Sequence, residues 1–177
     1  TEDHLRALFD VGFRRISLGL QDLNPSVQKA VNRIQSLELT KGVVDQARSI
    51  GFESVNIDLI YGLPRQTINS FAATLEQVLE MEPDRIALFN FAYLPEMFKH
   101  HSVIHPEEMP SASDKLQILI RSVQRIGYRG YRFIGMDHFA RESDELAKAQ
   151  DHGDLYRNFQ GYSTKKGLDV IAHGITG

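Results

Sequence analysis

The sequence contains no cysteine and no tryptophan. Without cysteine the chain can form no disulfide, has no thiol nucleophile, and can hold neither a thiolate zinc site nor an iron–sulfur cluster with its own side chains. No apolar run approaches the roughly 20 residues that a membrane-spanning helix needs, and the start, TEDHLRALFDVGFRR, lacks the pattern of a signal peptide. We therefore expect a cytoplasmic protein with no membrane association.

The sequence also lacks an excess of charge of either sign. Its 177 residues carry 20 basic and 23 acidic side chains, a formal net charge of -3, and Lys and Arg form no basic stripe. We therefore expect no nucleic-acid partner. With 42% hydrophobic and 24% charged residues, the composition is that of an ordinary globular chain that buries one core.

Both ends of the sequence indicate a piece of a longer protein. The chain begins without Met inside a helix-like segment, and it stops at IAHGITG, where an apolar strand would be expected to continue. Any sulfur ligands that the parent protein uses must then lie outside these residues.

Apolar strands alternate with amphipathic helices through the first part of the chain. Asn24 before Pro25 predicts a helix start, Gly51 a helix end, and Thr67 a further helix start. Strands are expected over 14–21, 54–62 and 85–92, and helices over 5–11, 24–33, 37–50 and 67–81. This alternation predicts an α/β fold whose parallel strands are covered by helices, in an open sheet or part of a barrel.

The second part of the chain has a less regular pattern. Residues 96–113 read as a long connection, with one helical turn near 95–99. A capped helix should follow over 113–127, then a strand-like run over 131–140 and a short helix over 143–150. The apolar face of the long helix is expected to consist of Leu116, Leu119, Ile120 and Val123.

Polar residues at strand ends are the first candidates for a binding site, because ligands collect at the carboxyl ends of parallel strands. These candidates are Gln21, Asp22, Asn56, Asp58 and Asn90. Asp58 is the most informative, since a carboxylate in an apolar strand is costly unless it is paired. It could bind a ribose or another ligand, pair with Arg33, or satisfy neighbouring backbone. By themselves, Gln21 suits a turn and Arg33 a helix end.

The histidines suggest a metal site, but their pattern does not support one. His100, His101 and His105 lack the helical i, i+4 spacing of a zinc motif, so we expect surface positions and no metal ligand. Asp137 and His138 could form an acid/base pair, although a buried hydrogen-bonded pair is the simpler interpretation. The remaining aromatic residues fit the core and its rim, or the walls of a flat macrocycle: Tyr93, Phe133, Phe139, Tyr156, Phe159 and Tyr162.

Five motifs carry a resemblance to a known family. They are, in order, RRISLGLQDLNPSVQKAVNRIQ, NIDLIYGLPRQT, DRIALFNFAYLP, FIGMDHFA and RNFQGYSTKKG. Together they resemble the oxygen-independent coproporphyrinogen III oxidase family of radical S-adenosylmethionine (SAM) enzymes, over essentially the whole chain. The strand and DLIYGLP segments are shared with related radical SAM proteins, whereas the last two motifs favour the oxidases.

The resemblance implies a fold and a cofactor site. The fold would be a partial (β/α) TIM-like radical SAM barrel, with residues 1–110 as its later half and 111–177 continuing into the start of a C-terminal region. SAM would bind against a [4Fe-4S] cluster whose CxxxCxxC ligands lie upstream of Thr1. Carried over residue by residue, Gln21, Arg33, Asp58 and Ala92 match SAM-contacting positions of the family. No catalytic residue is assigned within this chain.

The resemblance also implies an activity, namely oxidative decarboxylation of two propionates of coproporphyrinogen III to vinyl groups, giving protoporphyrinogen IX in haem biosynthesis. We expect the isolated chain to be inactive and the full-length protein to be a monomer. Two alternatives remain: a haem-carrying chaperone relative without decarboxylase activity, and a non-catalytic α/β domain whose strand-end polar residues are structural.

Overall fold

A five-stranded sheet lies at the centre of the computed structural model, which describes residues 1–158, 161–169 and 171. The spatial order of the strands is β1-β2-β3-β5-β4. The first three are parallel and adjacent in sequence order: β1 (Arg15–Gln21), β2 (Ser54–Tyr61) and β3 (Arg85–Asn90). Helices connect them, so the predicted α/β architecture with helix-covered parallel strands is confirmed.

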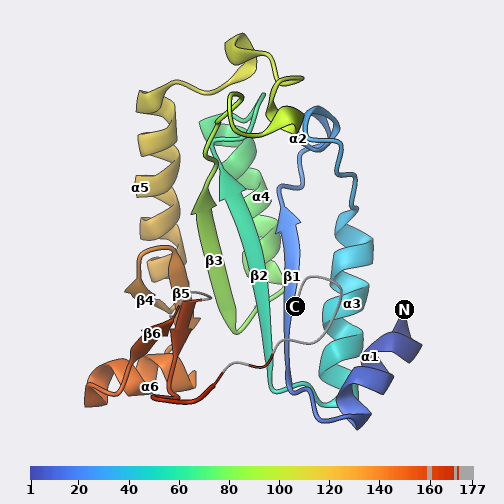
Figure 1. Ribbon diagram of the computed structural model, residues 1–177, viewed down its shortest axis with the longest axis vertical. Helices are drawn as coiled ribbons and strands as arrows, with labels where there is room; N and C mark the ends of the chain where they lie inside the picture. The colour runs from blue at the N-terminus through green and yellow to red at the C-terminus, as the bar shows by residue number, and fades with distance from the viewer. Residues whose placement is uncertain (159–160, 170, 172–177) are drawn as a thin grey trace.

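Helices α3, α4 and α5 pack on one side of the parallel strands, whereas the short helix α2 lies beyond the carboxyl end of β1 (Figure 1). Helix α4 runs behind β1 and β2, with α3 and α5 to either side; α1 packs on α3, and α4 packs on α5. The helices of this part are α1 (Glu2–Asp10), α2 (Pro25–Ala30), α3 (Leu37–Ile50), α4 (Ile68–Glu80) and α5 (Ala112–Tyr128). We call the opposite side of the sheet the inner face.

Strand β2 shows how the sheet divides apolar from polar side chains. Val55, Ile57 and Leu59 have no exposed surface and pack in the core with the helices. Because alternate side chains of a strand point to opposite faces, Asn56 and Asp58 project onto the inner face. The predicted apolar stripe of α4 is also confirmed as buried: Phe71, Leu75, Val78 and Leu79.

Local sequence signals set the helix boundaries as predicted. The Asn24 side chain accepts hydrogen bonds from the backbone N–H groups of Ser26 and Val27 at the start of α2. Gly51 ends α3 with a φ of 110°, a left-handed conformation that glycine adopts without strain. Thr67 and Ser70 form a capping box at the start of α4. These caps fix the ends of the helices that connect the strands.

The strand-like run over 131–140 is two strands, and the expectation of one is wrong. Strands β4 (Tyr131–Gly135) and β5 (His138–Arg141) form an antiparallel hairpin, and β5 pairs antiparallel with β3. Gly135 and Met136 turn the chain with φ values of 151° and 47°. A short apolar run gives no signal that separates one strand from a tight hairpin. The predicted division of the chain near residue 110 stays a prediction.

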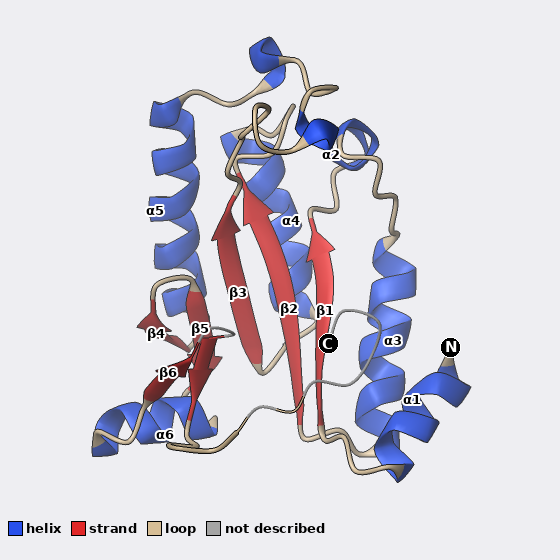
Figure 2. Cartoon of the chain, viewed as in Figure 1, coloured by secondary structure: helices blue, strands red, loops and turns tan. Residues whose placement is uncertain are grey.

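Helix α5 buries only part of the apolar face expected: Leu119 and Val123 are partly buried and pack against the core. Its buried residues are Ile118, Ser122 and Ile126, whereas Leu116 is 54% exposed and Ile120 is 41% exposed. The helix touches both α4 and β4, and this double contact turns its face away from the most apolar stripe. The helical turn expected near 95–99 is present, since the Phe98 N–H donates to the Leu94 carbonyl oxygen at 3.0 Å, and two short 3-10 helices follow at Lys99–His101 and Pro106–Glu108 (Figure 2).

The last described elements lie at the lower left in Figure 1, beside the amino ends of the parallel strands. They are α6 (Glu145–His152), which confirms the predicted short helix, and the two-stranded sheet of β6 (Tyr156–Asn158) and β7 (Gly161–Ser163). Residues 172–177, where an apolar strand was expected to continue, and Phe159 lie outside the described residues.

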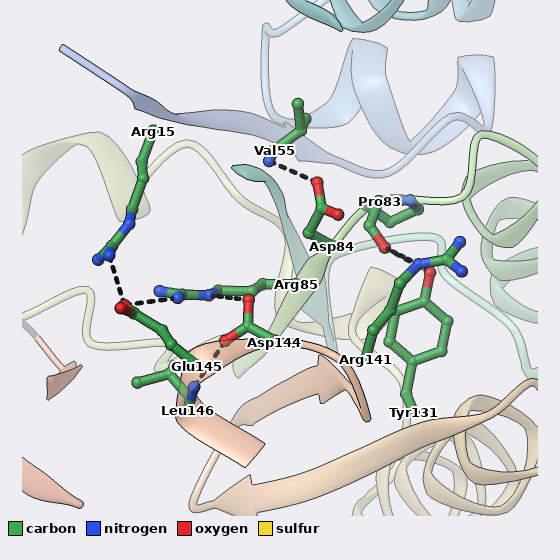
Figure 3. A network of polar contacts seen from close by, with 10 residues as sticks. All are labelled: Arg15, Val55, Pro83, Asp84, Arg85, Tyr131, Arg141, Asp144, Glu145 and Leu146. Atoms are coloured by element: carbon green, nitrogen blue, oxygen red, sulfur yellow. Dashed lines mark hydrogen bonds and ion pairs between the residues drawn. The ribbon is translucent and has the colours of Figure 1, made fainter. Parts of the chain in front are cut away.

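An ion-pair network joins α6 to the amino ends of the parallel strands (Figure 3). Arg85 at the start of β3 donates from Nε to Asp144 at 2.8 Å and pairs with Glu145 at 3.0 Å. Arg15 at the start of β1 pairs with Glu145 at 2.5 Å. Burial lowers the pKa of Arg85, but Asp144 and then Glu145 outweigh burial and raise that pKa above its ordinary value. Both arginines therefore already have anionic partners.

Candidate functional site

Strand β1 ends in a residue with unusual backbone geometry. Gln21 has a φ of 70°, which non-glycine residues rarely adopt, and the register with β2 shifts between Gly19 and Gln21. Such an irregularity changes the direction of a side chain at a strand end. Gln21 Oε1 is buried and has no hydrogen-bond partner among the described residues. A buried amide oxygen without a partner is costly, so Gln21 Oε1 is an acceptor that lacks a donor.

Gly19 brings the predicted site residues together. A Cβ at this position would lie 2.8 Å from Gln21 Nε2 and 3.1 Å from Arg33 Nη2, so glycine leaves the space that both side chains use. Arg33 Nη2 also donates a 2.5 Å hydrogen bond to the Gly19 carbonyl oxygen. Asp58 is the register partner of Gly19 on β2, and paired residues project to the same face. Gln21, Arg33 and Asp58 therefore converge around one glycine.

Asp58 is held by polar side chains of the inner face. Its Oδ1 accepts a hydrogen bond from Asn56 Nδ2 at 2.6 Å, and its Oδ2 accepts one from Ser17 Oγ at 3.1 Å. Asn56 Nδ2 also lies 2.8 Å from Ser17 Oγ. Of the three interpretations of Asp58, the ion pair with Arg33 is wrong, because the guanidinium turns to the Gly19 carbonyl. A carboxylate has about four acceptor positions, so Asp58 retains capacity for a ligand.

Two cavities open beside these residues. The upper cavity, of about 570 Å³, is lined by polar Gln21 and Arg33 and by apolar Ile60, Leu63 and Phe91. The lower cavity, of about 480 Å³, has Asp58 in its lining, with Ser17, Asn56, Phe89, His138 and Tyr162. Both volumes lie within the range of small-molecule sites.

Ala92 lies apart from the other three predicted residues. It follows β3 in an exposed segment and lines neither the upper nor the lower cavity. Its neighbour Phe91 lines the upper cavity and donates its backbone N–H to the Tyr61 carbonyl oxygen at 2.8 Å. The structure therefore groups three of the four predicted residues, and a ligand contact of Ala92 stays a prediction.

A buried network fixes the loops that follow β1 and β2. Asp22 is 1% exposed, and its Oδ1 accepts hydrogen bonds from the Asn24 N–H at 2.6 Å and the Thr74 hydroxyl at 2.8 Å. Its Oδ2 accepts one from Gln66 Nε2 at 2.6 Å, while Gln66 Oε1 accepts one from the Gly62 N–H at 2.6 Å. From sequence, Asp22 is only one strand-end polar residue among several. Its partner Thr74 is 52 positions away, so no local signal indicates this role.

The expected surface position is wrong for His101. It is 7% exposed, and its ring centroid lies 5.1 Å from that of Phe91 and 5.2 Å from that of Phe98. The Tyr93 ring stacks 6.1 Å away, and His101 Nδ1 accepts a hydrogen bond from the Leu94 N–H at 3.1 Å. The imidazole thus packs the long connection onto the segment after β3. Tertiary contact with aromatic rings buries a residue whose neighbours in sequence are polar.

Asp137 and His138 do not form the expected hydrogen-bonded pair. No hydrogen bond joins their side chains, and His138 Nδ1 is buried without a partner in the part of the chain that the structure describes. The imidazole meets the rings of Phe89 and Tyr162 edge-on, at 5.9 Å and 5.5 Å. Burial lowers the pKa of His138, and the charges of Asp137 and Asp58 oppose that effect without cancelling it. His138 is therefore neutral near pH 7 and lines the lower cavity.

The aromatic residues expected in the core or its rim occupy both. Phe139 is 2% exposed and Phe133 is 48% exposed, with their ring centroids 5.3 Å apart. Tyr93, Tyr156 and Tyr162 are partly buried. Of the members of this group that the structure describes, only Tyr162 lines one of the two cavities.

The chemistry of the site suits a polar organic ligand. Guanidinium, amide and carboxylate groups bind carboxylates, amines and hydroxyls through directed hydrogen bonds. No group of three or more His, Asp or Glu side chains that could hold a metal ion occurs within residues 1–158, 161–169 and 171. Since the chain has no cysteine, it can give no thiolate to an iron–sulfur cluster. The residues present therefore fit a polar organic ligand and cannot ligate an iron–sulfur cluster through thiolates.

Comparison with known proteins shows which proteins the chain resembles. A family model described as the radical SAM superfamily matches residues 1–78. The solved structure of Escherichia coli coproporphyrinogen III oxidase, described as a radical SAM enzyme, is 49% identical and superposes with a TM-score of 0.95 over 99% of this chain. The chain therefore resembles radical SAM enzymes over nearly its whole length. The resemblance read from its motifs and the expected radical SAM fold are both confirmed.

Among proteins of known function, the chain is similar to oxygen-independent coproporphyrinogen III oxidases. It is 54% identical to that of Thermostichus vulcanus over 166 residues and 51% identical to that of Escherichia coli over 174 residues. These matches cover 94% and 98% of this chain but only 51% and 37% of the two relatives, and 40% of the solved chain. The chain thus spans about half or less of the proteins it matches.

The lengths and composition of the helices bear on the expected location of the protein. Among the described residues, none of the helices combines the length and the apolar character needed to cross a membrane. The cytoplasmic location itself stays a prediction.

Proposed function

We propose that this chain forms part of an oxygen-independent coproporphyrinogen III oxidase and supplies residues that bind SAM. The observation that carries the proposal is the convergence of Gln21, Arg33 and Asp58 around Gly19, at the carboxyl half of parallel strands. Ligands collect there in α/β folds. The similarity to named oxidases over nearly the whole chain supports the same proposal.

Each residue has a group that matches a part of SAM. The Arg33 guanidinium suits the carboxylate of the methionine moiety, because the two can form charge-assisted hydrogen bonds. The unmet Gln21 Oε1 suits an N–H or O–H donor. The apolar walls of the upper cavity, among them Ile60 and Phe91, would exclude water from a bound nucleoside.

The proposed reaction is the oxidative decarboxylation of two propionate side chains of coproporphyrinogen III to vinyl groups, which yields protoporphyrinogen IX. Bound SAM and a [4Fe-4S] cluster would supply the radical chemistry, and ligation of the cluster falls to residues outside this cysteine-free chain. The work of this chain is to bind, orient and shield. Asp22 serves that work indirectly, because its buried network holds the backbone next to Gln21.

Equilibrium binding of SAM to the gene product that contains this chain tests the cofactor part. Arg33→Ala and Gln21→Ala should each weaken binding about tenfold, the effect of losing one charge-assisted or buried hydrogen bond. Arg6→Ala is a matched control, because Arg6 is exposed on α1, where it pairs with Glu2 at 3.0 Å. Full SAM affinity in both site variants would contradict the proposal.

An activity assay tests the substrate part. The gene product, with its cluster reconstituted under anaerobic conditions, should convert coproporphyrinogen III to protoporphyrinogen IX in the presence of SAM and a reductant. A haem-carrying relative would bind haem and leave coproporphyrinogen III unchanged, so the same assay separates the two functions.

A further inference from the structure

Gln28 is a buried amide whose hydrogen bonds reach beyond its own helix. It lies on α2, is 6% exposed, and lines neither the upper nor the lower cavity. Its Nε2 donates to the carbonyl oxygens of Asp22 at 2.8 Å and Gln35 at 2.6 Å. Its Oε1 accepts a hydrogen bond from the Gln35 N–H at 3.2 Å. The amide therefore binds backbone groups on both sides of α2, and we call this set of bonds the Gln28 bridge.

The Gln28 bridge fixes the backbone of the segment that carries Arg33. The Arg33 N–H donates to the Gln28 carbonyl oxygen at 2.9 Å, so Gln28 holds this segment at Arg33 through its backbone and at Gln35 through its side chain. The chain enters the segment through Asn32, whose φ of 51° is one that non-glycine residues rarely adopt. Such a conformation persists where surrounding contacts hold it, and the Gln28 bridge supplies those contacts.

The other end of the Gln28 bridge is the end of β1, which the Arg33 guanidinium also contacts. Asp22 follows β1 directly, and Arg33 Nη2 donates to the carbonyl oxygen of Gly19 within that strand at 2.5 Å. Gln28 therefore sets how the backbone of Arg33 lies relative to the strand that its side chain reaches. A guanidinium has five N–H donors in one rigid plane, so four remain for a ligand, and their direction depends on where the backbone is held.

Gln35 extends these contacts to α3. Its Nε2 donates to Thr40 Oγ1 at 2.9 Å, and Thr40 is 1% exposed. The segment between α2 and α3 is thus tied to both helices, and Gln28 is the side chain that ties it to the end of β1. We propose that Gln28 is a positioning residue for SAM binding, which holds the backbone around Arg33 so that the guanidinium meets the carboxylate of SAM. This inference rests on the proposed function.

A double-mutant cycle on SAM affinity tests the inference, with the gene product that contains this chain titrated by calorimetry. Gln28→Met keeps the length of the side chain but loses both donors and the acceptor, so it should weaken SAM binding about three- to tenfold. In the Arg33→Ala background the same change should weaken binding less than about twofold, because the group that Gln28 positions is then absent. Gln124→Met makes the same chemical change at an exposed position of α5 and should leave SAM affinity unchanged.

Two results would show that Gln28 only stabilises the fold, and either would overturn the inference while the proposed function stands. One is full SAM affinity in Gln28→Met together with a lower urea midpoint. The other is equal weakening of SAM binding by Gln28→Met in the natural and the Arg33→Ala backgrounds. If the natural form does not bind SAM, the proposed function fails and this inference fails with it.

A second variant keeps the test decisive if Gln28→Met does not fold. Gln28→Glu keeps the length and the acceptor and, when protonated, one of the two donors. It should weaken SAM binding less than Arg33→Ala does, and its effect should disappear in the Arg33→Ala background. An effect of Gln28→Glu that persists there would overturn the inference.

Discussion

Replacing Asp22 with alanine tests whether the buried network holds the site loops. The change removes the acceptor of three hydrogen bonds and leaves donors on Thr74 and Gln66, which are 2% and 3% exposed, without partners. Each bond to a charged group contributes about 1.5–3 kcal/mol, and neighbouring bonds do not add fully, so the expected loss is about 3–5 kcal/mol. That is a large share of the roughly 5–15 kcal/mol by which a domain is stable.

Urea unfolding of the gene product at 25 °C, followed by circular dichroism, measures this loss. Asp22→Asn should cost less, about 1.5–3 kcal/mol, because its amide keeps the shape but turns a donor toward Gln66 Nε2 or the Asn24 N–H. Thr74→Val removes one donor and should cost about 1 kcal/mol. A loss below about 1 kcal/mol for Asp22→Ala would mean that the loops do not depend on this carboxylate, and the reasoning would be refuted.

Three further predictions concern the site and its supports. Gly19→Ala should displace the Arg33 side chain and weaken SAM binding about tenfold, with little change in the urea midpoint because the displaced atoms end flexible side chains. Burial lowers the pKa of His138, so as the pH falls the unfolded chain takes up a proton before the folded chain does. The free energy of unfolding should therefore be at its full value above about pH 6.5 and decrease below it. In urea titrations at about pH 7.5 and 5.5, His138→Phe should show a smaller decrease than the natural form. Asp144→Ala removes the cap of α6 and the partner of the buried Arg85, so it should lower the free energy of unfolding by about 2–4 kcal/mol. Glu142→Ala breaks an exposed ion pair with Arg132 and should change the unfolding midpoint far less. Equal effects of the two variants would contradict this prediction.

Local signals predicted the elements that depend on local chemistry. Asn24, Gly51 and Thr67 mark helix boundaries because their side chains or backbone freedom act within a few residues. The hairpin at Gly135 was not predictable in the same way, because a short apolar run fits one strand or two. The buried face of α5 also depends on which neighbours it meets, and the most apolar stripe is not the one that α4 and β4 cover.

The candidate site was likewise predictable only in part from local sequence signals. Strand-end positions pointed to Gln21 and Asp58, and family resemblance added Arg33 and Ala92. Their convergence at Gly19 depends on the register between β1 and β2, which no single segment specifies. The pairing of Asp58 with Ser17 and Asn56 in place of Arg33 depends on it as well.

The sequence by itself determined the α/β class, the parallel strands with their helices and the absence of any thiolate ligand, because periodicity, capping residues and composition act locally or over the whole chain. Only the tertiary structure decided that Asp22 is an anchor, that His101 is buried among aromatic rings, and that His138 faces Asp58 across Ala87. Those relations join residues up to 80 positions apart, and their energies exist only once strand register and helix packing have brought the partners into contact.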